Sequence, residues 1–138
     1  MKARVTWLED RTFVGFSGSG HSVILGTKGE GEHSPGPSAM ELVLIGAGGC
    51  SAWDVVSILE KARQKISDVS VELEADRAET DPKVFTRIHL RFTVTGRGVD
   101  PRHAERAVQL SVEKYCSAMA MLEKTAKVSH EVAVVEAD

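Results

Sequence analysis

The sequence predicts a single α+β domain that spans residues 1–138. A chain of 138 residues has the length of one ordinary domain and buries roughly 68% of its unfolded surface. Apolar residues make up 42% and charged residues 27%, which is typical of a folded globular protein. Segments with a strand pattern are grouped and interrupted by helical segments, without the strict alternation that marks a parallel α/β fold.

The charge and hydropathy of the chain exclude several classes of protein. Lys and Arg total 17 against 20 Asp and Glu, and a net charge of −3 argues against nucleic acid as a partner. The first residues lack the apolar segment of a signal peptide. The longest predominantly apolar run without a charged residue, residues 42–53, has 12 residues, well short of the roughly 20 that span a bilayer. We therefore expect a cytoplasmic protein without a membrane partner.

The first third of the chain predicts a β-meander. Val5 and Trp7 alternate with polar neighbours, residues 13–16 are rich in β-formers, and an apolar triplet at 23–25 follows a glycine turn. Residues 26–37 then carry four glycines and two prolines. This composition predicts a loop that leads into a helix.

A central buried helix is predicted to begin at Ser38. Ser38 and Glu41 form the S-x-x-E pattern of a capping box directly before an apolar run. Glycines at 46, 48 and 49 each cost roughly 1 kcal/mol in a helix, so we expect a kink or break before Cys50. Residues 51–65 continue as helix, and the apolar composition through Leu59 predicts that its first three turns are buried.

The second half predicts a β-hairpin, two helices and a final strand. Alternation at 69–75 and 84–95 indicates two strands, the second with a core face and a polar face that includes Phe85. Asp100 followed by Pro101 predicts a helix start. A second helix is expected over 116–126 and a closing strand over 128–135. The inner face of the first of these helices is expected to hold Ala104, Ala107, Val108, Ser111, Val112 and Tyr115.

Cys50 is the first candidate for chemistry. A lone cysteine on an apolar helix is commonly an inert core residue, but two glycines before Cys50 remove side-chain cover. A break there would place Cys50 at a helix N-terminus, which stabilises a thiolate. Lowering a thiol pKa from about 8.5 to about 6.5 gains only about threefold in reactivity, because nucleophilicity falls as thiolate accumulates. A fast thiol catalyst therefore needs a positioned donor, and Arg11, in the first turn, is one candidate.

Three further residues each keep two interpretations. Cys116 is either a core residue or a resolving thiol that captures an oxidised Cys50. Glu41 either completes the helix cap or orients an arginine beside the thiol. Asp54, one turn after Cys50, needs a partner if buried, either a structural group or an arginine near the thiol.

Metal ions and phosphate cofactors are not expected. The chain has neither C-x-x-C nor H-x-x-x-H, and its five histidines are scattered. The glycine-rich loop lacks the Walker pattern.

Two segments resemble the OsmC/Ohr family. Residues 37–56 read PSAMELVLIGAGGCSAWDVV and resemble that family's P-x-E-L…A-x-G-G-C segment, while residues 113–116, EKYC, resemble its second cysteine segment. The resemblance is nearest to the uncharacterised OsmC-like branch. It implies an intertwined α+β homodimer with the site at the subunit interface. Met40 stands where the family has its activating Glu, Ala39 stands where Pro is usual, and Arg11 matches the Ohr arginine only by its place in the first turn.

The resemblance implies a thiol-dependent peroxidase that acts on organic hydroperoxides in oxidative stress defence. Cys50 would be the peroxidatic thiol and Cys116 the resolving thiol, recycled by an external dithiol reductant without a cofactor. The alternative is a non-catalytic OsmC-like protein that binds a ligand in an apolar pocket at the dimer interface or senses redox state.

Overall fold

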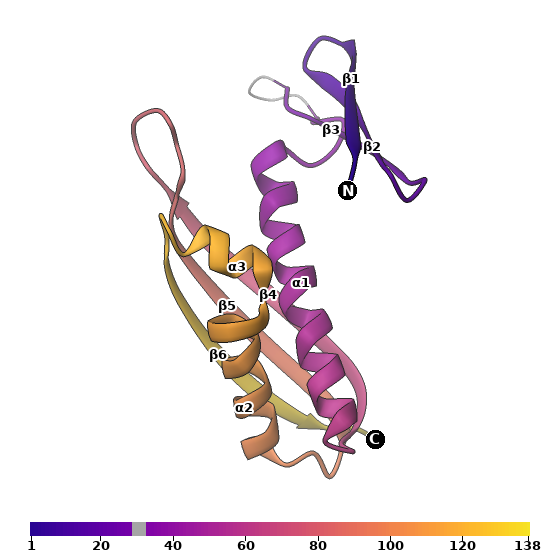
Figure 1. Cartoon of the computed structure of the whole chain (residues 1–138), viewed down its shortest axis with the longest axis vertical. Helices are drawn as coiled ribbons and strands as arrows, with labels where there is room; N and C mark the ends of the chain where they lie inside the picture. The colour runs from indigo at the N-terminus through magenta and orange to yellow at the C-terminus, as the bar shows by residue number, and fades with distance from the viewer. Residues whose placement is uncertain (29–32) are drawn as a thin grey trace. The chain divides into compact units, whose positions relative to one another are not determined.

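The computed structural model describes residues 1–28 and 33–138. Within this part of the chain lie two three-stranded sheets and three α-helices, so the predicted α+β class is confirmed. The contacts divide into two compact units, Met1–Ile45 and Gly46–Asp138 (Figure 1). Of the glycine-rich loop predicted at 26–37, residues 29–32 lie outside the described residues.

The N-terminal unit contains the predicted meander. Strands β1 (Ala3–Glu9), β2 (Thr12–Ser17) and β3 (Ser22–Gly26) pair antiparallel in that order. Gly26 is required where β3 meets the first turn, because a Cβ atom at this position would overlap the carbonyl oxygen of Arg11. The sheet leaves large apolar side chains in solvent, including Val5 at 63% and Trp7 at 64% exposure. Such a small sheet needs further apolar cover to be stable.

Helix α1 (Ala39–Lys61) begins with the predicted capping box. The Glu41 amide donates to Ser38 Oγ at 3.1 Å, and the Ser38 amide donates to Glu41 Oε1 at 2.9 Å. The predicted break at the glycines is wrong, because α1 runs without interruption for 23 residues. Packing explains the glycine at 48: a Cβ atom there would come within 2.7 Å of Leu73 Cδ1 on the neighbouring strand. Close approach, and not helix termination, is the role of this glycine.

Only one stripe of α1 is buried in the single chain. Its buried residues follow a spacing of mostly four and are Ala47, Gly48, Ser51, Val55 and Leu59. Trp53 is 71% exposed and Ile45 is 59% exposed, so the prediction that whole turns are buried is wrong for one copy of the chain. A single contact between a helix and a sheet covers only one apolar stripe of the helix.

By length and composition alone, α1 could cross a membrane. An 18-residue window in it has a mean hydropathy of 1.8, and 28% of that window is buried. The core helices of soluble proteins can have the same length and mean hydropathy.

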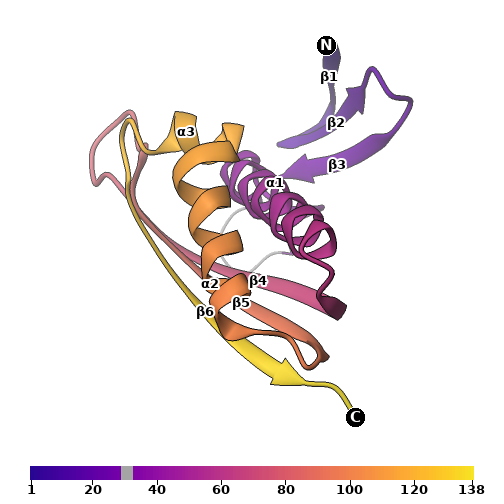
Figure 2. The ribbon, with the colours of Figure 1, turned by 60° about the horizontal axis from the view of Figure 1, so that its bottom comes forward.

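The second sheet has the order β4 (Lys65–Arg77), β5 (Phe85–Arg97), β6 (Lys127–Glu136). Strands β4 and β5 form the predicted hairpin, and β6 pairs parallel to β5. Helices cover one face of this sheet (Figure 2), where the core residues of β5 are Ile88, Leu90, Phe92 and Val94. Phe85 is also buried, contrary to its predicted polar face, because a register shift after Asp76 reverses the alternation at the start of β5.

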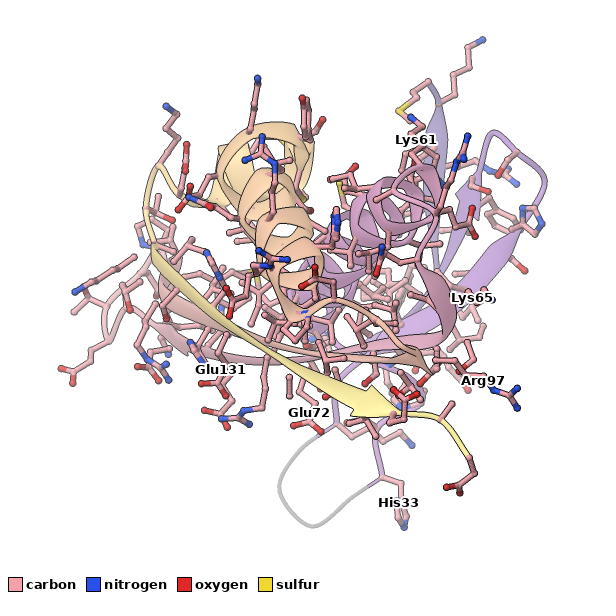
Figure 3. The ribbon with its side chains drawn as sticks, turned by 90° about the horizontal axis from the view of Figure 1, so that it is seen from below. His33, Lys61, Lys65, Glu72, Arg97 and Glu131 are labelled. Atoms are coloured by element: carbon pink, nitrogen blue, oxygen red, sulfur yellow. The ribbon has the colours of Figure 1, made fainter. Side chains whose placement is uncertain are left out.

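The opposite face of this sheet carries charge. Arg87 pairs with Asp76 at 2.7 Å, and Arg91 lies between Glu131 and Glu72. Figure 3 shows Glu72 and Glu131 on the side of the sheet away from the helices. This solvated ladder explains the polar face predicted for the hairpin.

A helical crossover connects β5 to β6. Helix α2 (Pro101–Leu110) begins as predicted, with Asp100 accepting a hydrogen bond from the Arg102 amide at 2.9 Å. A π-helical turn, η1 (Ser111–Tyr115), and a short helix, α3 (Ser117–Leu122), follow. The predicted second helix is therefore shorter than expected. The wider turn also rotates Tyr115 outward to 51% exposure and places Cys116 inward, which corrects the predicted inner face.

Candidate functional site

The structure brings the two cysteines together. Both thiols are free and both belong to the C-terminal unit, Cys50 half-buried on α1 and Cys116 buried at 1% exposure before α3. Cys116 contacts Ala47 and Ser51, which flank Cys50 on α1, and after burial the nearby Cys50 side chain is a further cause that raises the pKa of Cys116. The chain therefore places a half-buried cysteine beside a buried one.

Three groups contact the Cys116 sulfur. The Ser51 hydroxyl donates to Cys116 Sγ at 3.3 Å, and the Met119 amide donates to it at 3.4 Å. The thiol itself faces the Ala47 carbonyl oxygen at 4.0 Å. Burial raises the pKa of Cys116, and the hydrogen bonds from Ser51 and Met119 oppose that change without cancelling it. Cys116 is thus a neutral thiol at neutral pH.

Cys50 lies inside α1 and not at a helix end. It is the twelfth residue of the uninterrupted helix, whereas free backbone amides occur only in the first turn. The expected stabilisation of a Cys50 thiolate by a helix N-terminus is therefore wrong. Activation of this thiol has to come from side chains.

Asp54 joins the same group of residues through a hydroxyl. Its carboxylate is half-buried, and the Ser111 hydroxyl donates to Asp54 Oδ2 at 3.0 Å. Ser111 Oγ also lies 3.1 Å from the Ser51 carbonyl oxygen, so one hydroxyl proton is shared between two acceptors. Of the two partners considered for Asp54, the structural one is observed, because Ser111 binds it and the ion pairs of the described residues include no arginine partner for it. Partial exposure explains why a neutral partner suffices.

A groove opens beside these residues on the surface of α1. Its volume is about 520 Å³, within the range of small-ligand pockets. The lining combines aromatic and aliphatic side chains with one acid and one base, namely Trp53, Asp54, Ser57, Ile58, Lys61, Leu110 and Tyr115. An organic ligand with an apolar body would fit this lining.

Glu41 and Arg11 belong to the N-terminal unit. Glu41 precedes Cys50 by about two and a half turns of α1. The Ser38 backbone amide and then its hydroxyl lower the pKa of Glu41, in agreement with its structural role in the cap. Arg11 is exposed in the first turn and donates to the Asp10 carbonyl oxygen at 3.2 Å. Neither residue has a described hydrogen bond to a thiol.

Sequence reasoning missed Ser51, and it placed Ser111 on a buried helix face without giving it a role. Both are fully buried polar residues. A weak signal was present, because Ser51 is the only hydroxyl in the apolar run 42–53 and lies four residues after Ala47. Among residues 1–28 and 33–138, no group of three His, Cys, Asp or Glu is arranged to hold a metal ion.

Comparison with known proteins identifies the family. The sequence profile of the family described as OsmC-like protein matches residues 29–131, so the chain belongs to the OsmC-like family. It is 50% identical to Protein YhfA of Escherichia coli K12, over 99% of this chain and 100% of YhfA.

Solved structures agree with this assignment. A hypothetical protein from Aquifex aeolicus is 32% identical and superposes with a TM-score of 0.80, over 96% of each chain. A Legionella pneumophila protein, named an organic hydroperoxide resistance protein OsmC, is 17% identical with a TM-score of 0.68, over 96% of this chain and 95% of that one. At that identity, the second likeness shows the fold alone.

Proposed function

We propose that this protein is a thiol-dependent reductase of organic hydroperoxides. The observation that carries the proposal is the placement of the half-buried thiol of Cys50 beside the buried, neutral thiol of Cys116. Two thiols of unequal access are what a two-cysteine peroxidase needs, because one meets the peroxide and the other acts afterwards. The name of the Legionella relative, an organic hydroperoxide resistance protein, supports the choice of substrate class.

The reaction begins at Cys50. Its thiolate attacks the distal oxygen of the hydroperoxide, the O–O bond breaks, and the alcohol leaves with a proton. Cys50 is then a sulfenic acid. Cys116 attacks the Cys50 sulfur, an S–S bond forms, and the sulfenic hydroxyl leaves as water with the thiol proton of Cys116. An external dithiol reduces the disulfide and is itself oxidised, so the cycle uses no bound cofactor.

Burial assigns the two roles. Cys116 is 1% exposed, so a hydroperoxide cannot reach its sulfur without local opening. The groove that begins one turn after Cys50 offers an apolar surface for the organic group of the substrate. Attack by Cys50 and resolution by Cys116 therefore follow from access.

The leaving oxygen needs a donor. No arginine donates a hydrogen bond to Cys50 within the described part of the chain, and we assign this task to Arg11, with Glu41 as the acid that orients it. Arg11 and Glu41 both belong to the N-terminal unit. In a homodimer, either copy of the chain can supply this pair. The exposed apolar residues of β1 and α1 favour such a homodimer. The reducing environment of the cytoplasm would keep both thiols free.

A turnover assay tests the proposed function. Purified protein with dithiothreitol should consume cumene hydroperoxide at many equivalents per chain, and Cys50→Ser should abolish this consumption. The exposed variant Ser70→Ala serves as the control, because its hydroxyl lies on β4 away from both thiols. A parent protein that reacts no faster than Cys50→Ser contradicts the proposal.

A second candidate is a protein that binds an organic ligand and reacts slowly. The position of Cys50 inside a helix and the engagement of Glu41 in the cap favour it, since free helix amides do not stabilise the thiolate and the described contacts of Glu41 are with Ser38 and not with an arginine. Slow stoichiometric oxidation with saturable binding of an apolar ligand in the groove would distinguish this function from catalysis.

A further inference from the structure

Ser51 contacts both ends of the π-helical turn that precedes Cys116. Its carbonyl oxygen lies 3.1 Å from the hydroxyl of Ser111, the first residue of η1. Its own hydroxyl donates to the sulfur of Cys116, the residue directly after η1. The turn is closed by the Cys116 amide, which donates to the Ser111 carbonyl oxygen at 2.8 Å. One residue of α1 therefore fixes where the second thiol lies.

Burial makes these contacts specific. Ser51 and Ser111 are both fully buried, so neither hydroxyl has water as an alternative partner. A π-helical turn is rare and is found frequently at functional sites, and here it has side-chain contacts with a neighbouring helix. Ser51, which lies on α1 outside the turn, supports it through its contacts with Ser111 and Cys116.

We propose that Ser51 is a positioning residue for the second thiol, holding the turn that presents Cys116 and stabilising the thiolate that forms when Cys116 loses its proton before it attacks oxidised Cys50. The catalytic part of this inference rests on the proposed function. The effect of Ser51 on the Cys116 thiol does not, and it can be measured without peroxide.

The chemistry of the resolving step explains the need. Cys116 must lose its proton to become a nucleophile, and burial opposes the charge that results. The Ser51 hydroxyl and the Met119 amide both point their protons at this sulfur, and both bonds strengthen as charge develops there. The S–S bond forms as the S–O bond of the sulfenic acid breaks, and the thiol proton leaves in water.

The size of the effect follows from these terms. Loss of one hydrogen bond raises a thiol pKa by roughly one unit, which leaves about tenfold less thiolate at neutral pH. A more basic thiolate is about 2.8-fold more nucleophilic at a Brønsted slope of about 0.45. Resolution should therefore slow about 3.5-fold near pH 7, and the deficit should shrink and then reverse at pH values where both thiols are ionised and only the nucleophilicity differs.

The first measurement follows Cys116 alone. In the Cys50→Ser protein, the ¹³Cβ chemical shift of Cys116 is titrated with and without Ser51→Ala. We expect the midpoint to rise by about one pH unit. In Ser51→Thr, which keeps the hydroxyl, Cys116 should titrate as in the parent. Valine has nearly the same shape as threonine but no hydroxyl, so in Ser51→Val Cys116 should titrate as in Ser51→Ala. The comparison of Ser51→Thr with Ser51→Val isolates the effect of the hydroxyl on Cys116. It replaces the Ser51→Ala measurement if Ser51→Ala does not fold.

The second measurement follows a single turnover with one equivalent of cumene hydroperoxide. Ser51→Ala should form the Cys50 sulfenic acid at the parental rate and the disulfide about 3.5-fold more slowly at pH 7. Parental titration of Cys116 in both Ser51→Ala and Ser51→Val would overturn the inference, as would Ser51→Thr behaving like Ser51→Val. If the titration moves but the parent does not react with hydroperoxide, the proposed function fails and the action of Ser51 on Cys116 is supported.

Discussion

At the scale of single residues, polar contacts around α1 decide the character of the site. Ser51 bonds the buried thiol, Ser111 bonds Asp54, and Cys50 alone is accessible. Sequence patterns identified both cysteines and Asp54, because each is an unusual residue in an apolar segment. They did not identify the contacts of Ser51 and Ser111, since these contacts depend on how η1 packs against α1.

Asp54→Ala should destabilise the protein by only about 1 kcal/mol. The variant loses one hydrogen bond from Ser111, whose hydroxyl keeps the Ser51 carbonyl oxygen as an acceptor. Urea unfolding checks this value against Asp68→Ala, an exposed acid of β4 that should change little. A loss of several kcal/mol for Asp54→Ala would instead indicate a buried cation left without its partner.

The Cys116 thiol should make the folded state sensitive to alkaline pH. Burial raises the pKa of Cys116 in the folded protein, so the unfolded chain releases this proton first. The corresponding stability is complete below the unfolded pKa of about 8.5 and is lost as pH rises above it. Under reducing conditions, the unfolding free energy should fall less steeply from pH 8 to pH 10 in Cys116→Ser than in the parent. Equal slopes would contradict the assigned pKa direction.

At the scale of elements, local sequence signals predicted where helices begin, but they did not predict whether a helix is interrupted. The caps at Ser38 and Asp100 lie where the sequence places them, because a capping pattern is read from three or four neighbouring residues. The continuity of α1 through its glycines, the π-helical turn and the parallel pairing of β6 all depend on tertiary packing. A glycine that admits a neighbouring strand and a glycine that ends a helix have the same local pattern.

Two glycine substitutions in α1 should therefore act in opposite directions. At Gly46 a Cβ atom meets nothing within 4 Å, so Gly46→Ala should stabilise the helix by up to about 1 kcal/mol. At Gly48 the Cβ atom would crowd Leu73, and Gly48→Ala should destabilise by about 1–2 kcal/mol despite its better helix propensity. Denaturant unfolding measures both. Equal stabilisation by the two changes would show that Leu73 moves aside at little cost.

At the scale of the whole molecule, one copy of the chain leaves much apolar surface uncovered. Trp7, Ile45 and Trp53 are each more than half exposed, and the N-terminal sheet has little core of its own. A second copy is the simplest cover for such surfaces. The family resemblance had implied a homodimer, and the exposed residues supply a physical reason for it.

The protein should sediment at twice its chain mass of 14.9 kDa at micromolar concentration. Ile45→Glu should shift this equilibrium toward the monomer, because the exposed isoleucine would carry a charge into an apolar interface. Gln109→Glu, at an exposed position of α2, is the matched control and should leave the dimer intact. A parent protein that is monomeric at this concentration would contradict the homodimer.

Mass spectrometry of peroxide-treated protein tests the central claim most directly. One equivalent of an organic hydroperoxide should produce an intramolecular Cys50–Cys116 disulfide, with a mass loss of two hydrogens per chain. In Cys116→Ser the reaction should stop at a Cys50 sulfenic acid that dimedone traps. Two free thiols after treatment, with Cys50 also unreactive toward alkylating agents at neutral pH, would contradict the account.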